Sequence, residues 1–249
     1  MGISKKRIIA ITQARTGSTR LPRKVLLTIN GQTLLQIHLD RVSKSKTIDE
    51  VIVATTDKET DEPIMKIAQE LGYKCYRGSE NDVLDRYYQA AKGANAEVVV
   101  RVTSDCPLVD PDLIDTIVNA HLVHGTDFTS NIVKRTFPDG MDVEVFSFQA
   151  LEKAWKEASL PSDREHVTYY IWKNSDLLNG KKFTSLNITA TNNQNLSHIR
   201  LTLDYPEDKV LLEKLIEIDG IEKSWNDYVN TLLKNPSLLE INKSVNSNL

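Results

Sequence analysis

The sequence of 249 residues predicts an α/β protein built on a mostly parallel sheet. Three short runs rich in β-branched residues, at residues 7–12, 51–56 and 98–103, have the unbroken hydrophobicity of strands buried on both faces. Longer stretches with helical periodicity separate these runs, and that alternation is typical of βαβ units. Hydrophobic residues make up 40% of the chain and charged residues 26%, which is the balance of an ordinary globular protein.

The helices that follow these strands have recognisable boundaries. Amphipathic stretches long enough for crossover helices occupy residues 33–42, 60–71 and 82–92. A fourth helix is predicted to begin at Asp110, as N-cap, with Pro111 in its first turn, and to end at Gly125. The first half of the chain therefore predicts four consecutive helices packed against a parallel sheet.

Beyond residue 125 the pattern becomes more mixed. Strand-like alternation is found at residues 142–148 and 198–203, and helical periodicity at residues 150–158, 164–174, 207–218 and 224–234. We expect one domain over residues 1–240, in which residues 130–195 form a small inserted α+β excursion. The polar residues 241–249 are expected to be a frayed tail.

Composition and charge exclude several classes of function. The formal net charge of −3 provides no basic field to hold a nucleic acid polymer. No hydrophobic run approaches the ~18 residues of a membrane-spanning helix, and the first residues lack the pattern of a signal peptide. The two cysteines, Cys75 and Cys106, show no disulfide-rich or C-x-x-C spacing. We therefore expect a cytoplasmic protein with no membrane partner.

A loop with four cations follows the first predicted strand, at residues 13–24. Its cations are Arg15, Arg20, Arg23 and Lys24, and glycine and hydroxyl residues between them offer N–H and O–H groups to an anion. Ligands of open α/β sheets bind beyond the carboxyl ends of the strands, where this loop should lie. The loop is neither a Walker A sequence nor a G-x-G-x-x-G turn. It predicts a binding site for a nucleoside triphosphate, and the alternative is a solvated basic surface loop.

Two aspartates stand at the ends of predicted strands. Asp105 follows the strand at 98–103 and Asp204 follows the one at 198–203, so their carboxylates should emerge at the same edge as the cationic loop. Such a pair is suited to hold Mg²⁺ against phosphate oxygens. The alternatives are an aspartate that stabilises a turn at 105 and a helix cap at 204.

Three motifs together resemble the cytidylyltransferase family that includes the CMP-Kdo and CMP-sialic acid synthetases. They are QARTGSTRLPRK at 13–24, TSDCPLVDP at 103–111 and RLTLDYPEDK at 200–209. The likeness is strongest to spore coat polysaccharide-type members, which also carry patterns similar to FPDGMDVE at 137–144 and REHVT at 164–168. The resemblance spans roughly residues 7 to 235.

The resemblance implies a Rossmann-like (GT-A-like) nucleotidyltransferase with three α/β/α layers. It implies a homodimer that transfers CMP from CTP to a sugar with Mg²⁺ and releases pyrophosphate. Arg15, Lys24 and Asp105 are then the catalytic groups, and Asp105 and Asp204 hold the metal. The implied nucleotide-binding residues are Ala14, Arg15, Thr16, Gly17, Ser18, Arg20, Arg23, Lys24, Arg77, Asp82, Thr103, Ser104 and Asp105.

The acceptor remains open at the level of sequence. Recognition is expected from the excursion at 130–195, through Asp142, Glu144, Arg164 and His166, although a surface ion pair explains Arg164 equally well. Val25 and Cys106 depart from the sialic acid and Kdo patterns, so the acceptor can be an acidic keto-sugar, a polyol phosphate or a phosphonate. The rival classes are a glycosyltransferase that uses a nucleotide sugar and a binding module without catalysis.

Overall fold

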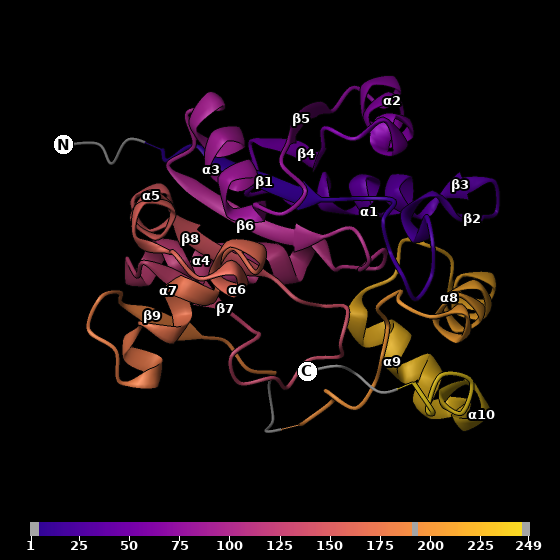
Figure 1. Cartoon of the computed structure of the whole chain (residues 1–249). Helices are drawn as coiled ribbons and strands as arrows, with labels where there is room; N and C mark the ends of the chain where they lie inside the picture. Colours follow the sequence, from indigo (N-terminus) through magenta and orange to yellow (C-terminus); the bar gives the residue numbers. More distant parts are fainter. Residues whose placement is uncertain (1–4, 191–193, 246–249) are drawn as a thin grey trace.

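A seven-stranded sheet forms the centre of the computed structural model, which describes residues 5–190 and 194–245 (Figure 1). The strand order is β5-β4-β1-β6-β8-β7-β9, and every strand except β8 runs in the same direction. The strands are β1 (Ile8–Gln13), β4 (Glu50–Thr56), β5 (Lys74–Gly78), β6 (Val98–Thr103), β7 (Phe128–Ser130), β8 (Glu144–Ser147) and β9 (Ser185–Asn187). The mostly parallel α/β sheet predicted from the sequence is confirmed.

Helices cover both faces of this sheet, because β1 alternates its side chains between two hydrophobic cores. Ile8 and Ala10 enter one core, and Ile9 and Ile11 enter the other. The first core is covered by α1 (Leu34–Val42), α2 (Glu62–Glu70), α4 (Pro111–His124), α8 (Pro206–Asp219) and α9 (Trp225–Lys234). The second is covered by α3 (Val83–Gly93), α5 (Phe148–Glu157) and α7 (Tyr169–Lys173). The three α/β/α layers are therefore present.

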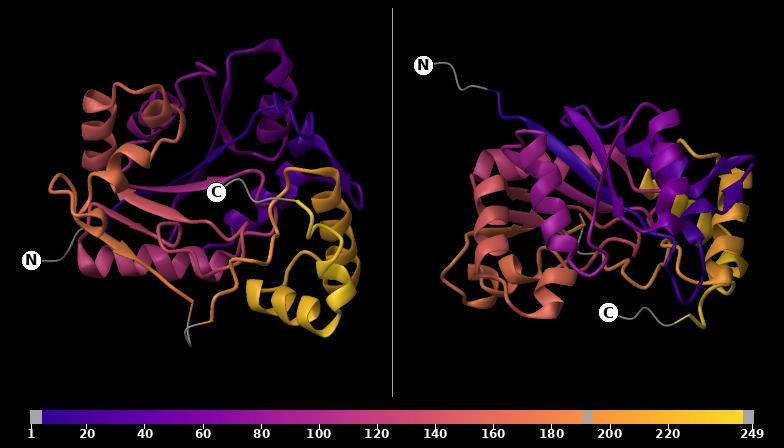
Figure 2. Two further views of the ribbon diagram at one scale, coloured as in Figure 1. Left: turned by 60° about the horizontal axis from the view of Figure 1, so that its bottom comes forward. Right: turned by 45° about the horizontal axis from the view of Figure 1, so that its top comes forward.

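The remaining elements are short. They are the β2 (Thr28–Ile29) and β3 (Gln32–Thr33) hairpin, α6 (Pro161–Glu165), α10 (Pro236–Leu239) and the 3₁₀ turns η1 (Lys24–Leu26), η2 (Glu59–Asp61) and η3 (Asp176–Leu178). The two views of Figure 2 show α8, α9 and α10 gathered at one end of the molecule. None of the helices in the described part of the chain is long and apolar enough to cross a membrane.

The helix boundaries expected from the sequence are largely confirmed. Thr33 caps α1 by accepting the N–H of Gln36, and Asp82 caps α3 in the same way. Asp110 accepts two N–H groups at the start of α4, and Gly125 ends that helix in the left-handed conformation, with φ of +62°. These caps are local interactions, so their sequence signals carry over directly to the fold.

Two predicted elements have to be corrected. The single helix expected at 164–174 is interrupted, because Val167 has φ of +53° and separates α6 from α7. The strand expected at 198–203 does not form. Its buried residues extend past two loops instead, and the N–H groups of Leu201 and Leu203 donate to the carbonyls of Asp139 and Asp105. Asp204 therefore follows an extended segment, not a strand of the sheet.

The region at 130–195, expected to be an excursion, contributes to the sheet itself. Strand β8 pairs antiparallel with β6, and β9 forms the edge next to β7. The strand predicted at 142–148 is thus confirmed in its central part. The predicted tail also makes contacts, since Asn242 is buried.

Candidate active site

The cationic loop lies at the carboxyl end of β1, where one buried carboxylate anchors it. Asp61, in η2, accepts the N–H of Thr16 at 2.7 Å and its hydroxyl at 2.5 Å, and also the hydroxyl of Thr56. Burial opposes ionisation of Asp61, but these hydrogen bonds outweigh it and lower its pKa. Thr16 is buried and in turn accepts the N–H groups of Ser18 and Arg23. Asp61, which the sequence did not single out, therefore fixes the loop from behind.

A cavity of about 570 Å³ opens in front of this loop. Among the residues predicted for the site, its walls contain Ala14, Arg15, Gly17, Ser18, Arg20, Lys24, Thr103, Ser104, Asp105, His166 and Asp204. The walls also contain Gln13, Thr19, Val25, Glu80, Asn81, Val83, Arg86, Arg101, Pro161 and Glu165. Residues from the start, the middle and the end of the chain thus converge on one cavity.

Lys24 lies between the two aspartates predicted to hold a metal. Its ammonium donates to Asp105 at 2.8 Å and to Asp204 at 2.7 Å. Burial favours neutral forms of Lys24 and Asp105, but their mutual attraction dominates, so the pKa of Lys24 is raised and that of Asp105 is lowered to about 2. Asp105 and Asp204 therefore meet as predicted, although Asp204 does not follow a strand.

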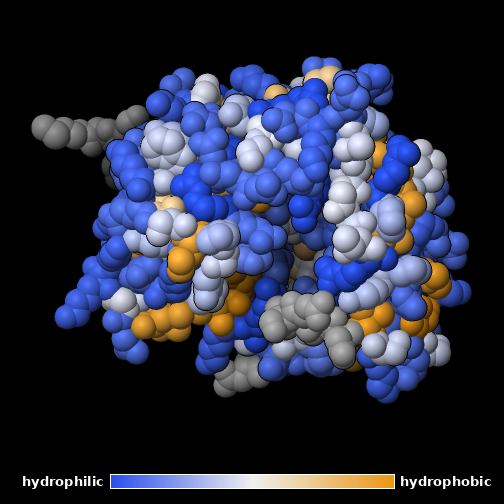
Figure 3. Space-filling model, viewed as in Figure 1, coloured by the Kyte–Doolittle hydropathy of each residue, from blue (hydrophilic) through white to orange (hydrophobic). Residues whose placement is uncertain are grey.

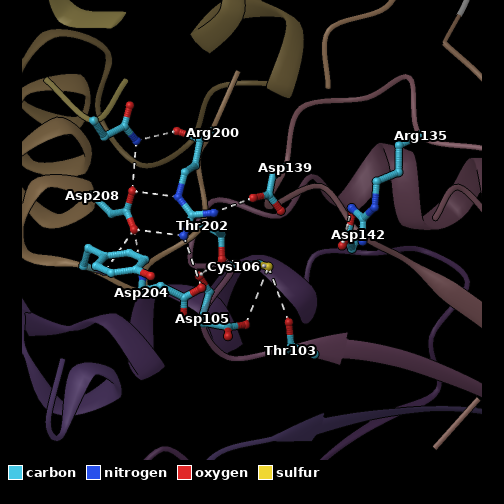
Figure 4. Close-up of polar contacts among 12 residues, drawn as sticks. Thr103, Asp105, Cys106, Arg135, Asp139, Asp142, Arg200, Thr202, Asp204 and Asp208 are labelled. Carbon is cyan, nitrogen blue, oxygen red and sulfur yellow. Dashed lines mark hydrogen bonds and ion pairs between the residues drawn. The ribbon is translucent and has the colours of Figure 1, made fainter. Parts of the chain in front are cut away.

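Asp204 is also the end point of a network of buried charges, shown in Figure 4. Arg200 donates to Asp204 at 3.1 Å, to Asp139 at 2.8 Å and to both oxygens of Asp208 at 3.0 and 3.1 Å. Arg20 contacts the same oxygen of Asp204 at 3.0 Å. Burial opposes the charge of Arg200, but its three carboxylate partners raise its pKa. The second aspartate is thus held by the protein before any ligand binds.

A second cavity, of about 170 Å³, adjoins the first and shares Arg20, Thr103, Asp105 and Asp204 with it. Its other walls are Cys106, Arg135, Asp139, Asp142, Arg200 and Thr202. Figure 4 shows Arg200 paired with Asp139, Arg135 paired with Asp142, and Thr103 in contact with Cys106. Asp105 and Asp204 therefore stand at the junction of two polar cavities.

Asp142 and Arg135 form a two-point ion pair inside the smaller cavity. One guanidinium nitrogen of Arg135 lies 2.8 and 2.9 Å from the two oxygens of Asp142. Burial raises the pKa of Asp142 to about 6, even though Arg135 acts in the opposite direction. Both side chains are one-quarter exposed. They can therefore still hydrogen-bond to a ligand in the smaller cavity.

Several residues predicted for the site contact protein instead of a cavity. Glu144 is buried and pairs with Arg101 and the hydroxyl of Thr168. Arg164 binds Asp82 at 2.6 and 3.0 Å and the Trp155 carbonyl at 2.8 Å. Two more arginines predicted for the site, Arg77 and Arg23, lie in nearby segments and do not line the cavity. Arg77 donates to the carbonyls of Thr56 and Lys58, and Arg23 is an exposed turn residue with φ of +56°.

Two arginines of the larger cavity were missed at the level of sequence. Arg86, on α3, and Arg101, on β6, each have a buried Nε with no hydrogen-bond partner among the described residues. These are donors that a bound anion can satisfy. Arg101 had a signal, because a charge within the apolar run at 98–103 requires a partner. Arg86 had none, since a cation on an amphipathic helix usually faces solvent.

The two aspartates fit a divalent cation of the Mg²⁺ type. The bridging ammonium of Lys24 shows that both carboxylates can hold one cation. Within residues 5–190 and 194–245, no group of three or more His, Cys, Asp or Glu side chains is placed to bind a metal. Mg²⁺ is typically bound by one or two carboxylates together with waters and substrate phosphates. The arrangement therefore suits a metal that is shared with a phosphate ligand.

Known proteins similar to this chain identify its family. A family model described as cytidylyltransferase matches residues 9–241. An uncharacterized protein of Methanocaldococcus jannaschii is 42% identical over 96% of both chains. The spore coat polysaccharide biosynthesis protein SpsF of Bacillus subtilis is 34% identical over 92% of this chain and 95% of its own.

A solved structure extends the agreement to three dimensions. A cytidylyltransferase from Leptospira borgpetersenii superposes with a TM-score of 0.87 at 35% identity, covering 98% of this chain and 99% of its own. The resemblance to spore-coat-type cytidylyltransferases, and the Rossmann-like nucleotidyltransferase fold that it implied, are confirmed. The chain therefore belongs to the cytidylyltransferase family of nucleotidyltransferases.

Proposed function

We propose that this protein transfers CMP from CTP to a hydroxyl group of a sugar acceptor, with Mg²⁺, and releases pyrophosphate. One observation carries the proposal: Asp105 and Asp204 both bind the ammonium of Lys24, at the point where two polar cavities meet. A nucleotidyl transfer needs two bound substrates, the nucleoside triphosphate and the acceptor, on either side of the phosphorus that is attacked. The two adjoining cavities supply that arrangement.

The larger cavity is proposed to bind the nucleotide. Arg15, Arg20, Lys24, Arg86 and Arg101 give its walls five cationic side chains, which suit a triphosphate. Arg15 and Lys24 are assigned to the β- and γ-phosphates, where they stabilise the charge that develops on the departing pyrophosphate.

Asp105 and Asp204 are proposed as the residues that would hold Mg²⁺. When bound, the metal neutralises charge on the phosphoryl oxygens and orients the attacking group. Asp105 keeps its charge near neutral pH, because its pKa is lowered to about 2. Lys24 contributes by leaving the carboxylates and turning its ammonium to the phosphates.

The acceptor is assigned to the smaller cavity, next to Asp142. Its lining alternates guanidinium donors, Arg135 and Arg200, with carboxylate acceptors, Asp139 and Asp142, and such a lining suits a polyhydroxylated or acidic sugar. In the reaction the acceptor oxygen forms a bond to the α-phosphorus as the bond from that phosphorus to the pyrophosphate oxygen breaks. The hydroxyl proton leaves to solvent or to a carboxylate of the cavity. His166, in the wall of the larger cavity, remains assigned to substrate binding.

We propose that the region at 130–195 binds the acceptor and forms the interface of a homodimer. The protein is proposed to be cytoplasmic. The region supplies Arg135, Asp139 and Asp142 to the smaller cavity. It also exposes Leu160, Leu177 and Leu178, and Figure 3 shows hydrophobic residues near the part of the molecule where α7 and β9 lie. An exposed apolar surface of this kind often marks a protein contact.

The test is pyrophosphate release from each of the four ribonucleoside triphosphates with Mg²⁺ and a panel of acceptors. The panel contains acidic keto-sugars, neutral sugars, polyol phosphates and phosphonates. We expect release with CTP and a sugar, and a loss of about 10²-fold or more in Asp105→Asn. Asp112→Asn, at the exposed start of α4, is the matched control and should retain activity.

The other outcomes separate the rival functions. Release with a polyol phosphate or a phosphonate alone would change the acceptor class. Transfer from a ready-made nucleotide sugar without pyrophosphate would replace the proposal with a glycosyltransferase. Tight CTP binding with no release from any acceptor would indicate a binding module, and failure to bind any triphosphate would refute the proposal.

A further inference from the structure

We infer that Asn242, near the C-terminus, is a positioning residue for the metal-binding carboxylate of Asp204. The inference rests on the proposed function, since it concerns the same carboxylate. Asn242 follows α10 by three residues and lies in the segment whose polar composition predicted a frayed tail. Its side chain is nevertheless buried, with 5% exposure.

The amide of Asn242 makes two hydrogen bonds to the network behind Asp204. Its Nδ2 donates to the main-chain carbonyl of Arg200 at 3.1 Å and to Oδ1 of Asp208 at 2.9 Å. Both partners are buried. The end of the chain therefore contacts the segment that carries Asp204, although Asn242 lines neither of the two cavities at Asp105.

Asp208 passes this support to Asp204 in two ways. Its Oδ2 accepts the main-chain N–H groups of Asp204 at 2.9 Å and of Tyr205 at 3.0 Å. Its two oxygens also hold Arg200, which donates to the Asp204 carboxylate. Both the backbone and the side chain of Asp204 thus depend on where Asp208 is held, and Asn242 is one of its fixed partners.

The polar character of position 242 follows from what surrounds Asp208. The Asp208 carboxylate is buried, and without the Asn242 amide its Oδ1 would keep the Nε of Arg200 as its donor and lose one hydrogen bond. A donor amide satisfies Asp208 and the Arg200 carbonyl together, whereas a carboxylate at 242 would face Asp208 with a like charge. Partners in the outer shell of a metal site typically affect metal affinity by 10–100-fold. We expect an effect at the lower end of that range, because Asn242 acts through Asp208.

The experiment compares Asn242→Ala and Asn242→Asp with Asn235→Ala. Asn235 is the matched control: it is exposed, and its amide also donates to a main-chain carbonyl, that of Thr231, at 2.9 Å. The first readout is hydrogen exchange of the Asp204 and Tyr205 amides in the protein without ligands. The second is the affinity for Mn²⁺ measured by electron paramagnetic resonance with CTP present, and the third is the Mg²⁺ concentration at half-maximal pyrophosphate release.

We expect exchange of the two amides to quicken about fivefold in Asn242→Ala, the equivalent of one hydrogen bond. Mn²⁺ affinity should fall about tenfold, and further in Asn242→Asp, while excess Mg²⁺ restores most of the rate. Asn235→Ala should change none of the three readouts. Equal exchange rates and Mn²⁺ affinities in Asn242→Ala and Asn235→Ala would overturn the inference. Absence of pyrophosphate release from the unmodified protein would overturn the proposed function alone, because exchange is measured without substrate.

Discussion

Lys24 is the residue that connects the two halves of the proposed reaction. Its ammonium pairs with both Asp105 and Asp204 in the structure, and it is proposed to pair with the triphosphate when the nucleotide binds. Lys24→Met should therefore lower kcat for pyrophosphate release by about 10²–10³-fold, the loss typical of one preorganised electrostatic contact. Lys66→Met, an exposed change on α2, is the control and should leave kcat within twofold of the unmodified protein. Equal kcat values in the two variants would contradict the role given to Lys24.

His38 predicts how stability depends on pH. It is fully buried between the hydroxyl of Thr12, at 2.7 Å, and the Cys106 carbonyl, at 2.9 Å, and burial lowers its pKa to about 4. In the unfolded chain His38 binds a proton near pH 6.5, whereas in the folded protein it does so only near pH 4. The free energy of unfolding therefore decreases as the pH falls through this window. Between pH 7 and pH 5 this loss amounts to about 2 kcal/mol.

The test of that dependence is urea unfolding at both pH values. His38→Gln keeps a side chain that can hydrogen-bond but removes the titrating group. The free energy of unfolding of His38→Gln should therefore change less between pH 7 and pH 5 than that of the unmodified protein, by about 2 kcal/mol. His121, whose pKa burial also lowers to about 4, remains in both proteins and accounts for part of the shared loss. An identical pH dependence in both would exclude His38 as a source.

Residues of the site could be predicted where a charged side chain follows the end of a predicted strand. Arg15 and Asp105 come two residues after β1 and β6, and Lys24 ends the loop that Arg15 begins, so their place at the sheet edge could be inferred from the strand before them. Arg135 and Arg200 could not be found in that way, because they depend on loops folding toward each other. Their ion pairs with Asp142 and Asp139 become visible only in three dimensions.

Among the elements, the loop at 137–143 depends on Gly140. This glycine has φ of +104°, and a Cβ there would lie 2.7 Å from the backbone of Leu201 and Thr202. Gly140→Ala is therefore expected to destabilise the protein by about 3 kcal/mol and to move Asp139 away from Arg200. Gly125→Ala is the control, since Gly125 is also left-handed, with φ of +62°, but no atom lies within 4 Å of the added Cβ, and it should cost about 1 kcal/mol. Thermal unfolding of both variants checks the difference, and equal losses would mean that the close approach has no cost.

Elements were predictable where the signal is local or the burial is two-sided. β1, β4 and β6 are buried on both faces, and α1, α3 and α4 carry their own caps. The structure adds β5, β7 and β9, which are short edge or near-edge strands; β5 is only half-buried and β7 and β9 have three residues each. The segment at 198–203 has the hydrophobic alternation of a strand, but loops satisfy its N–H groups. Alternation of hydrophobic and polar residues indicates that one face of a segment is buried, but it does not show which groups its backbone N–H groups bind.

At the scale of the whole molecule, the C-terminal helices must stay fixed to the sheet for Asp204 to meet Asp105. Arg41, on α1, makes that connection from a position with 2% exposure. Its guanidinium donates to the carbonyl of Val109, which follows β6, and to the carbonyls of Ile221 and Lys223, which join α8 to α9. One side chain thus connects the first third of the chain to the loop after β6, which begins near Asp105, and to the helices that follow Asp204.

Arg41→Lys should therefore destabilise the whole fold. A lysine keeps the charge but cannot reach three carbonyls in different directions, so buried acceptors lose their donors, at about 3 kcal/mol of unfolding free energy. Arg77→Lys is the matched control: Arg77 also donates to two carbonyls, those of Thr56 and Lys58, but it is less buried, and the change should cost below about 1 kcal/mol. Guanidinium unfolding gives both values. A loss in Arg41→Lys no larger than that in Arg77→Lys would mean that the packing of α8 and α9, not Arg41, holds the C-terminal helices in place.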